Sequence, residues 1–466
     1  MFLHLGMCNN SMFMTGSLLM EKIVSLAKRR GFIFPGSEIY GGLAGIYDYG
    51  PLGVELRHNI KQHFWNRFIA ERDDVYGMSA AILMPARVWE ASGHTESFAD
   101  PLVECRVCHG RFRADQPTDI STHEEWHKHK KEKAEWTQPT IFNLLVQTQL
   151  GAKEKLENIQ QSAVYLRGEI TQGVQVNFKN ILDSMHPKLP FGIGQIGKAF
   201  RNEIAPRDFL FRQREFEQME LQYYIRPDEA EGKKQFEYWK QFAFDWYQSL
   251  GIQKDHLRLR QHAEDERAHY AKDAWDIEYN SPMGWKEAWG IHHRGDWDLR
   301  RHQEYSGVSM EYTDSDTGGK MLPWDIECSC GVDRAVLFTL LDAYREDELN
   351  KEVRSYLALA PKIASVKAMV SPLLKNKPKL VEKAHEVHAA LKKVHSAIAW
   401  DDNGNIGKRY RRQDEIGTPF CITIDFDTLG ETSELKDTVT LRHRDTGEQE
   451  RLTIPEAAER IRLAIQ

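Results

Sequence analysis

The chain has 466 residues, 41% hydrophobic and 28% charged, which is enough apolar material for a large core and enough length for at least two domains. Its net charge of -7 excludes a protein that coats nucleic acid through an overall positive field, so any RNA contact must be local. Six cysteines without a regular framework, and no apolar run near the roughly 18 residues that span a bilayer, predict a soluble cytoplasmic protein that contacts no membrane.

The first nineteen residues are rich in Met and carry no Lys or Arg, so they match neither a secretory signal nor a transit peptide. We expect residues 1–19 to be a disordered or artefactual leader, with Met20 as the natural start. From Met20 the spacing of Ile23, Val24 and Ala27 predicts a helix that stops at Gly31.

Residues 20–360 have the pattern of an antiparallel sheet backed by helices. The loop GGLAGIYDYGPLG precedes the helix-periodic stretch VELRHNIKQHFWNRFI, and a second long helix is predicted in DEAEGKKQFEYWKQFAFDWYQSL. The segments VQVNF, FEQMELQYYI and WDIEYN have the composition of strands. Within this domain, the polar composition of residues from about 100 to 165 predicts a surface insertion.

Residues 361–466 alternate between helical and strand-like patterns, which predicts a separate α/β domain. A Lys-rich helix is expected around 377–397, and FCITIDFD is expected to be a strand. The segment VTLRHRDTGEQERLTI predicts a hairpin that turns at Asp445 to Gly447.

The segment FRNEIAPRDFLFRQREFEQMELQYYI, residues 200–225, predicts an antiparallel hairpin, because Pro206 and Asp208 interrupt two strand-like runs. The period of two then gives one face of the second strand a guanidinium, an aromatic ring and a carboxylate: Arg214, Phe216, Gln218 and Glu220. An arginine can bind a phosphate bidentately and a flat ring can stack on a purine, so this face suits a nucleoside triphosphate. The alternative is a charged edge hairpin.

This segment closely resembles motif 2 of class II aminoacyl-tRNA synthetases. Its order of residues is specifically similar to that of the dimeric glycyl-tRNA synthetases. DIECSCGVDRAVLFTLL resembles motif 3, and GGLAGIYDYGPLGVELRHNI resembles motif 1, which builds the dimer interface around Pro51. Other similar segments are ARVWEASGH, GEITQGVQVNF, WKEAWGIHHRGDWDL and YRRQDEIGTPFCITIDFDTL. Seven ordered matches from about Met20 to the C-terminus are more specific than any single motif.

The resemblance implies an α+β class II catalytic domain, an antiparallel sheet flanked by helices, followed by a C-terminal α/β anticodon-binding domain. It implies a homodimer that uses ATP with Mg²⁺ to make glycyl-adenylate and then transfers glycine to tRNA(Gly). Family members also form diadenosine tetraphosphate, so this side activity is an expectation. The enzymatic alternative is a synthetase for serine, threonine or proline. The non-enzymatic alternative is an inactive RNA-binding paralogue. The retention of Arg201, Phe216 and Arg334 argues against this alternative.

The resemblance also implies site residues. Arg201 and Arg334 are implied as catalytic groups: Arg201 at the α-phosphate and the glycine carboxylate, Arg334 at the γ-phosphate. The residues implied for ATP are Arg201, Asn202, Glu203, Phe211, Arg212, Gln213, Arg214, Glu215, Phe216, Glu287, Ala288, Gly331, Val332, Asp333 and Arg334. Those implied for glycine are Arg87, Glu169, Phe216, Glu217, Gln218, Met219, Glu220, Glu327, Cys328, Ser329, Cys330 and Gly331.

Two positions depart from the family pattern. Gly168 and Cys328 stand where the family usually has proline. Because proline restricts the unfolded chain, its loss is expected to loosen loops that hold the pocket carboxylates and to lower affinity. Every charged or aromatic group that the reaction needs is retained.

Two further clusters are candidate binding sites. Cys105, Cys108, His123 and His127 have the spacing C-x2-C-x14-H-x3-H, which suits a structural zinc site. The alternative is two free thiols beside a charge run that is rich in His. The C-terminal domain has a basic cluster beside Tyr410, made of Lys408, Arg409, Arg411 and Arg412. Such a cluster suits binding of anticodon bases and phosphates, and the alternative is a solvated loop.

Overall fold

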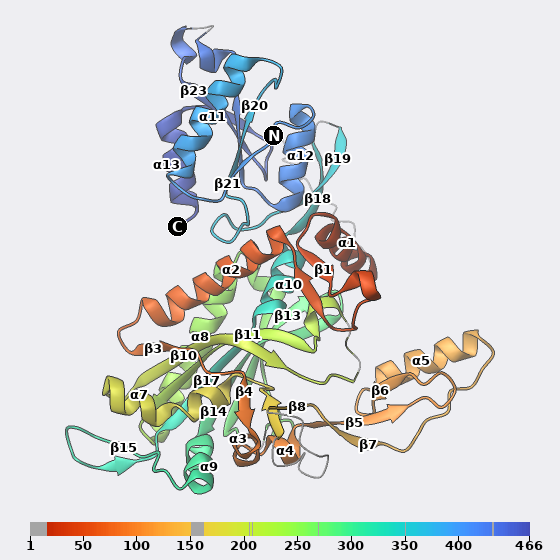
Figure 1. The fold of residues 1–466 in the computed structure, drawn as a ribbon, viewed down its shortest axis with the longest axis vertical. Coiled ribbons are helices and arrows are strands. Elements are labelled where there is room, and N and C mark those ends of the chain that lie inside the picture. The colour runs from red at the N-terminus through yellow and green to blue at the C-terminus, as the bar shows by residue number, and fades with distance from the viewer. Residues whose placement is uncertain are drawn as a thin grey trace, which may run out of the picture.

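A computed structural model describes residues 16–150 and 163–466, apart from positions 205, 207, 269, 350, 431 and 432. It has a central sheet with helices, an arm that projects to one side, and a C-terminal domain, drawn in blue in Figure 1. The expected leader lies outside the described residues as far as residue 15. Residues 16–19 already belong to the first helix, α1 (Gly16–Arg29), which therefore begins before Met20.

The main body is built on a seven-stranded sheet in the order β12-β13-β14-β17-β11-β10-β3. All neighbours are antiparallel except β10 and β3, so the predicted α+β class with an antiparallel sheet is confirmed. The strands are β3 (Val75–Met78), β10 (Phe191–Phe200), β11 (Glu215–Ile225), β12 (Leu257–Gln261), β13 (Asp273–Ser281), β14 (Gly284–Gly295) and β17 (Trp324–Gly331).

One face of this sheet is covered by long helices. They are α2 (Pro51–Trp65), continued by the π-helix η2 (Asn66–Ala70), α8 (Glu229–Ser249) and α10 (Val332–Ala343). Their apolar sides pack on Met219, Leu221 and Cys330 to form the main core. The rings of Phe64, Phe68, Trp239, Trp246 and Trp289 meet there.

The other face of the sheet is partly polar and is covered by shorter helices. They are α3 (Ala86–Ala91), α4 (His94–Ser97), α6 (Thr171–Gln175), α7 (Phe178–Met185) and α9 (Trp297–Ser306). The expectation of a strand at VQVNF, residues 174–178, is therefore wrong, because Val174 and Gln175 end α6, Phe178 begins α7, and the two residues between them form a turn. Val174 and Phe178 are buried against Tyr224 of β11, so a short apolar run packs here as helix rather than strand.

The arm corresponds to the polar insertion and contains a small sheet in the order β6-β5-β7 (Figure 1). Its elements are β5 (Ala99–Glu104), β6 (Arg111–Arg113), α5 (Pro117–His129) and β7 (Thr140–Asn143). The chain returns to the body through β8 (Val146–Gln149) and β9 (Ala163–Leu166), which pair with β4 (Leu83–Pro85) in a second small sheet. Short strand pairs elsewhere are β1 (Ile33–Pro35) with β2 (Tyr47–Tyr49), and β15 (Tyr312–Thr313) with β16 (Lys320–Met321).

The C-terminal domain follows a hairpin of β18 (Tyr344–Leu349) and β19 (Glu352–Leu357). It has a five-stranded sheet in the order β21-β20-β22-β23-β24, with a core of its own. The strands are β20 (Ala368–Pro372), β21 (Ile398–Trp400), β22 (Phe420–Ile424), β23 (Thr438–His443) and β24 (Gln449–Thr453). The helices are α11 (Pro378–Lys392), α12 (Ile406–Ile416) and α13 (Ile454–Ala464). The predicted Lys-rich helix and terminal hairpin are both present.

Candidate active site

A cavity of about 270 Å³ lies over the polar face of the sheet, where β11, β14 and β17 meet the loop between β10 and β11. Its wall contains four guanidinium groups, three carboxylates and two phenyl rings. The lining residues are Arg113, Leu144, Arg201, Glu203, Leu210, Phe211, Arg212, Gln213, Phe216, Gln218, Glu287, Ser329, Gly331, Asp333 and Arg334.

Arg201 is fixed at one side of this cavity, directly after β10. Its Nε donates a hydrogen bond of 3.0 Å to the carbonyl oxygen of Gly168. Its guanidinium lies 5.1 Å from the ring centroid of Phe98 and 5.2 Å from that of Phe216. These contacts hold the charge beside the aromatic ring without neutralising it.

Arg334, in the first turn of α10, stands at the other side. Its Nη1 lies 2.9 Å from a carboxylate oxygen of Glu287, and its Nε donates to the carbonyl oxygen of Phe211 over 3.3 Å. The guanidinium is also 4.5 Å from the ring centroid of Phe211. The charge of Arg334 lowers the pKa of Glu287. The cavity thus has a cation at each side and rings between them, as a nucleoside triphosphate requires.

A buried cluster of carboxylates adjoins the cavity. Glu220 accepts a hydrogen bond from the hydroxyl of Ser329 over 2.7 Å and from that of Thr171 over 2.7 Å. Thr171 lies 2.9 Å from Glu327, so one hydroxyl bridges the two carboxylates. Glu169 completes the cluster, and its side chain lies 3.2 Å from Nε2 of His94. The three carboxylates are at most 9% exposed, so water cannot fully screen them.

The three carboxylates differ in protonation. Burial and the charges of Glu327 and Glu169 raise the pKa of Glu220 to about 8. Burial also acts to raise the pKa of Glu327, but Arg294 and the hydrogen bond from His292 outweigh it and lower the pKa to about 2. The unpaired member, Glu220, therefore carries a proton at neutral pH until a cation binds next to it.

Several side chains that the sequence assigned to the glycine pocket lie elsewhere. Glu217 and Met219 point to the helix-covered face of β11, where Glu217 pairs with Arg57 over 2.8 Å. Cys328 and Cys330 are buried in the same core. These four side chains face away from the pocket, because residues of a strand alternate between its two faces, so the predicted glycine contacts of these residues would be made by their backbone atoms.

Three other assigned side chains also lie away from the cavity. The side chains of Ala288 and Val332 belong to the main core, so only the backbone atoms of these residues lie near the cavity. Arg87 is exposed, pairs with Glu90 over 3.1 Å and stacks on Tyr305, in a hollow between α3, α7 and α9. Arg87 therefore does not line the cavity, and its role in glycine binding stays a prediction.

The rest of the predicted ATP set lies in or beside the cavity. Arg214 donates to the carbonyl oxygen of Glu203 over 3.2 Å and 3.3 Å, so it braces the loop rather than continuing the row of Phe216, Gln218 and Glu220. The backbone N–H of Asn202 donates to Leu144 over 2.8 Å. Glu215 pairs with Lys198. The remaining members, which line the cavity wall, are Glu203, Phe211, Arg212, Gln213, Gly331 and Asp333.

The sequence did not single out the groups that hold the carboxylates. His292 and Arg294 of β14 lie 2.7 Å and 2.9 Å from Glu327, and Gln172 donates to Glu169 over 3.1 Å. These residues lie within the segments GEITQG and GIHHRGDWDL. Motif similarity therefore identified the segments but did not identify these residues as part of the site. Their partners are far apart in sequence, and only the fold brings them together.

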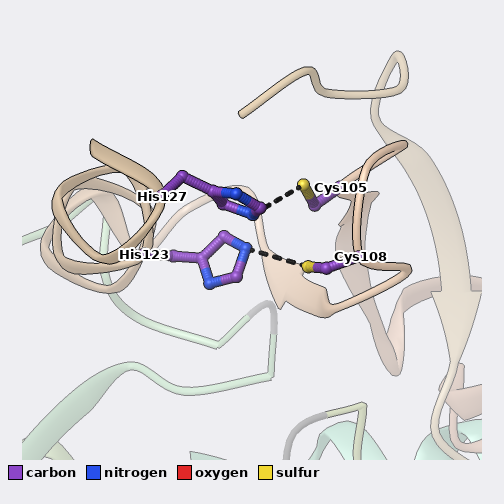
Figure 2. Close-up of side chains that lie close together, drawn as sticks. All are labelled: Cys105, Cys108, His123 and His127. Atoms are coloured by element: carbon purple, nitrogen blue, oxygen red, sulfur yellow. Dashed lines mark hydrogen bonds between the residues drawn. The ribbon is translucent and has the colours of Figure 1, made fainter. Parts of the chain in front are cut away.

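The four predicted zinc ligands meet at the end of the arm. Figure 2 shows His123 and His127 on one side of α5 pointing toward Cys105 and Cys108, which lie in the turn between β5 and β6. The Sγ of Cys105 lies 3.5 Å from Nε2 of His127, and that of Cys108 lies 3.3 Å from Nε2 of His123. All four ligand atoms lie within 4.8 Å of one another.

The basic cluster of the C-terminal domain is divided by the structure. Arg409 is buried and donates to the Ser371 hydroxyl over 2.6 Å and to three backbone carbonyls, so its guanidinium is engaged inside the domain and does not face solvent. Arg412 forms a bidentate pair with Asp401, donating from Nη2 to Oδ1 over 2.8 Å and from Nε to Oδ2 over 3.0 Å. Lys408 and Arg411 are exposed, although Arg411 pairs with Glu352.

None of the described helices is long and apolar enough to cross a bilayer. Residues 155–397 match the family described as tRNA synthetase class II core domain (G, H, P, S and T), and residues 367–463 match an anticodon binding domain. The chain is 50% identical to a glycine–tRNA ligase of Caldanaerobacter subterraneus over 457 residues, which are 93% of this chain and 96% of that protein.

A glycine–tRNA ligase of Geobacillus kaustophilus is 48% identical over 94% of this chain and 97% of its own length. One from Treponema denticola is 47% identical over 96% and 97%. Matches of this identity and coverage, together with the class II core, show that the chain belongs to the glycine–tRNA ligase family of class II tRNA synthetases.

Proposed function

We propose that the chain activates glycine with ATP and transfers it to the 3′ end of tRNA(Gly). The observation that carries the proposal is the buried carboxylate cluster beside a cavity lined by cations and rings. Glycine has only an ammonium group for positive recognition, and carboxylates bind ammonium strongly when both are removed from water. The cavity supplies the neighbouring place for a nucleotide.

In the first step the carboxylate oxygen of glycine attacks the α-phosphorus of ATP, and the bond to the β-phosphate oxygen breaks to release pyrophosphate. The nucleophile is already an anion, so no general base is needed. Arg201 stabilises the charge that develops on the α-phosphate, and Arg334 binds the outer phosphate. Phe216, beside Arg201, stacks on adenine. Mg²⁺ accompanies the triphosphate, and the cavity carboxylates Glu203 and Glu287 are oxygen ligands of the kind it prefers.

Selectivity for glycine follows from the closed surroundings of the cluster. Gln218 donates to Glu220 over 2.9 Å, and Ser329 and Thr171 occupy its other oxygen positions. A side chain larger than hydrogen would overlap these groups, and steric overlap rejects larger amino acids without an editing step. Alanine, serine, threonine and proline are therefore expected to be excluded.

ATP–pyrophosphate exchange tests this proposal without tRNA. Exchange is expected with glycine and not with alanine, serine, threonine or proline, and Arg201→Ala should lower it about 100-fold or more. The matched control is Arg258→Ala, which removes a guanidinium from β12 of the same sheet, where it pairs with Glu278 outside the cavity wall. Exchange with serine in place of glycine would contradict the glycine assignment. The absence of exchange with all five amino acids would favour a non-catalytic RNA-binding protein.

In the second step the terminal ribose hydroxyl of tRNA attacks the adenylate carbonyl, and AMP leaves. The C-terminal domain is proposed to bind the anticodon end, which its match to an anticodon binding domain supports. Lys408 is exposed near the start of α12 and is the strongest remaining candidate for a phosphate contact. ATP could also attack the adenylate in the same site, which would give the diadenosine tetraphosphate expected from the family.

A structural zinc ion is proposed at the end of the arm. A tetrahedral Zn²⁺ with two thiolates and two imidazoles requires sulfur-to-nitrogen separations of roughly 3.5 Å. The observed separations of 3.5 Å and 3.3 Å fit this requirement. Nδ1 of His127 lies 3.0 Å from Glu132, and such a contact directs the opposite ring nitrogen toward a metal.

A homodimer is proposed from the surface of the N-terminal segment. Ile39, Tyr40 and Leu43 are 88%, 86% and 65% exposed, at the start of the segment that resembles the dimer motif of the family. Of these, Leu43 belongs to the quoted segment itself, and Ile39 and Tyr40 directly precede it. Large apolar side chains at such exposure suit burial against a second copy of the chain. A cytoplasmic location also remains a proposal, and the five described cysteines, all of which are free, support a reducing environment.

A further inference from the structure

A second hollow, of about 490 Å³, lies between α3, α7 and α9 at the lower end of the main body in Figure 1. Its lining shares no residue with that of the candidate active site. We propose that this hollow binds a neutral, largely apolar small molecule with one N–H or O–H donor, and that the bound molecule weakens glycine binding. The effect on glycine rests on the proposed function, whereas the binding site does not. The apolar part of the wall is Pro85, Val88, Ala91, Val176, Val308 and Met310.

The buried polar group of this wall is His302 of α9, which is 4% exposed. Its Nε2 lies 2.8 Å from Oε1 of Gln172. The amide nitrogen of Gln172 donates to the carboxylates of Glu169 over 3.1 Å and of Asp298 over 2.9 Å. Because ionised carboxylates only accept hydrogen bonds, this nitrogen must face them, and the Gln172 oxygen must accept from His302. His302 therefore carries its proton on Nε2.

The other ring nitrogen of His302, Nδ1, is then an acceptor. Nε2 is directed at the buried Gln172, so Nδ1 is the ring nitrogen that a molecule in the hollow can reach. Within the part of the chain that the structure describes, no group donates to Nδ1. A molecule that fills the hollow without a donor would leave this acceptor unsatisfied, so the wall favours one with an N–H or O–H group. Burial lowers the pKa of His302, which keeps the ring neutral at physiological pH.

The charged side chains at the rim of the hollow are already paired. Arg87 lies 3.1 Å from Glu90, and Lys179 lies 3.1 Å from Asp183. A charged molecule would compete with these pairs and would also lose water against an apolar wall. The hollow has the size and mostly apolar lining of small-molecule sites, and its single buried acceptor sets the polar requirement.

Gln172 connects the hollow with the glycine cluster, because its amide contacts both His302 and Glu169. A donor on Nδ1 makes the Nε2–H group of His302 a stronger donor, and hydrogen bonds in a chain strengthen one another. The stronger bond from Gln172 then draws negative charge on Glu169 away from the glycine ammonium. We therefore expect weaker glycine binding when the hollow is filled, and glycine weakens binding in the hollow by the same factor.

The probes are indole and N-methylindole, which share an apolar ring system but differ in the N–H donor. A saturation-transfer NMR titration of the full chain should give a Kd for indole about tenfold below that for N-methylindole. Equal Kd values, or no binding of either probe, would overturn the proposal, and this comparison needs neither a variant nor glycine.

The place of binding is tested with Val308→Trp, which puts a larger side chain into the hollow at a 46% exposed position. This variant should lose indole binding. The matched control is Val353→Trp, because Val353 is 74% exposed in β19 and does not line the hollow. Indole binding that persists in a folded Val308→Trp variant would place the site elsewhere and would overturn the proposal.

The effect on glycine is measured in ATP–pyrophosphate exchange with and without saturating indole. The KM for glycine should rise about fivefold while the KM for ATP stays unchanged, and Val308→Trp should remove this response. An unchanged KM for glycine, or equal rises for glycine and ATP, would refute the connection through Gln172. A failure of the proposed function would appear as absent exchange without indole, whereas a failure of this site would appear in the indole titration.

Discussion

Glycine binding should depend on pH through Glu220, whose pKa burial and the neighbouring Glu327 and Glu169 charges raise to about 8. The ammonium of glycine needs the ionised carboxylate, so below this pKa binding must also remove a proton. Each pH unit below about 8 then costs about 1.4 kcal/mol, or tenfold in affinity. The KM for glycine should fall about tenfold from pH 6 to 7, about fivefold more by pH 8, and level off above that.

The assay is ATP–pyrophosphate exchange at constant ionic strength, with glycine varied at each pH and ATP saturating. Glu220→Gln should raise the KM and remove its pH dependence, because the amide does not titrate. Glu217→Gln is the matched control, since Glu217 lies in the same strand but pairs with Arg57 and Lys61 on the opposite face. A flat profile for the unmodified protein between pH 6 and 8 would refute the reasoning, because glycine would then bind without ionising Glu220.

The other predictions concern the C-terminal domain, the arm and the stability of the fold. Arg409→Ala should lower the free energy of unfolding by about 2–3 kcal/mol, because it leaves buried acceptors unsatisfied, whereas Lys408→Ala should weaken tRNA binding with an unchanged melting temperature. Cys108→Ser should lower zinc content in atomic emission and speed proteolysis of the arm; full zinc content would argue against the site. Gly53→Ala should lower the melting temperature, since its Cβ would lie 1.9 Å from the Phe32 carbonyl oxygen, while exposed Val54→Ala should change it little.

The motifs predicted the centre of the site because they combine charge with regular strand spacing. Phe216, Gln218 and Glu220 share the polar face of β11, as the period of two requires. The same rule separates Glu217 from Glu220, yet the resemblance assigned both to one pocket. The directions of the two side chains follow the strand alternation, because it comes from backbone geometry.

The other contacts of these residues could be found only from the three-dimensional fold. Arg294 supports Glu327 from a neighbouring strand, and no local pattern in the sequence pairs them. Arg409 belongs to a basic run, but its own helix turns it inward to cap the carbonyl ends of nearby loops. Arg113 lies in an insertion whose composition predicts only a solvated surface. A charged residue in a polar run can therefore be structural, as Arg409 is, or reach a cavity, as Arg113 does, and burial and contacts decide between these outcomes.

The structure also changes the interpretation of the two departures from the family pattern, Gly168 and Cys328. Cys328 does not lie in a loop: it is buried within β17 and is paired with Leu221 on one side and Ile291 on the other. A proline cannot donate to such a ladder, so cysteine suits a central strand better. At Gly168 an added Cβ would lie 3.0 Å from the ring of Phe98, while the carbonyl oxygen accepts from Arg201. Glycine there leaves room for the ring of Phe98 beside the backbone, while the carbonyl oxygen of the same residue holds Arg201 at the side of the cavity.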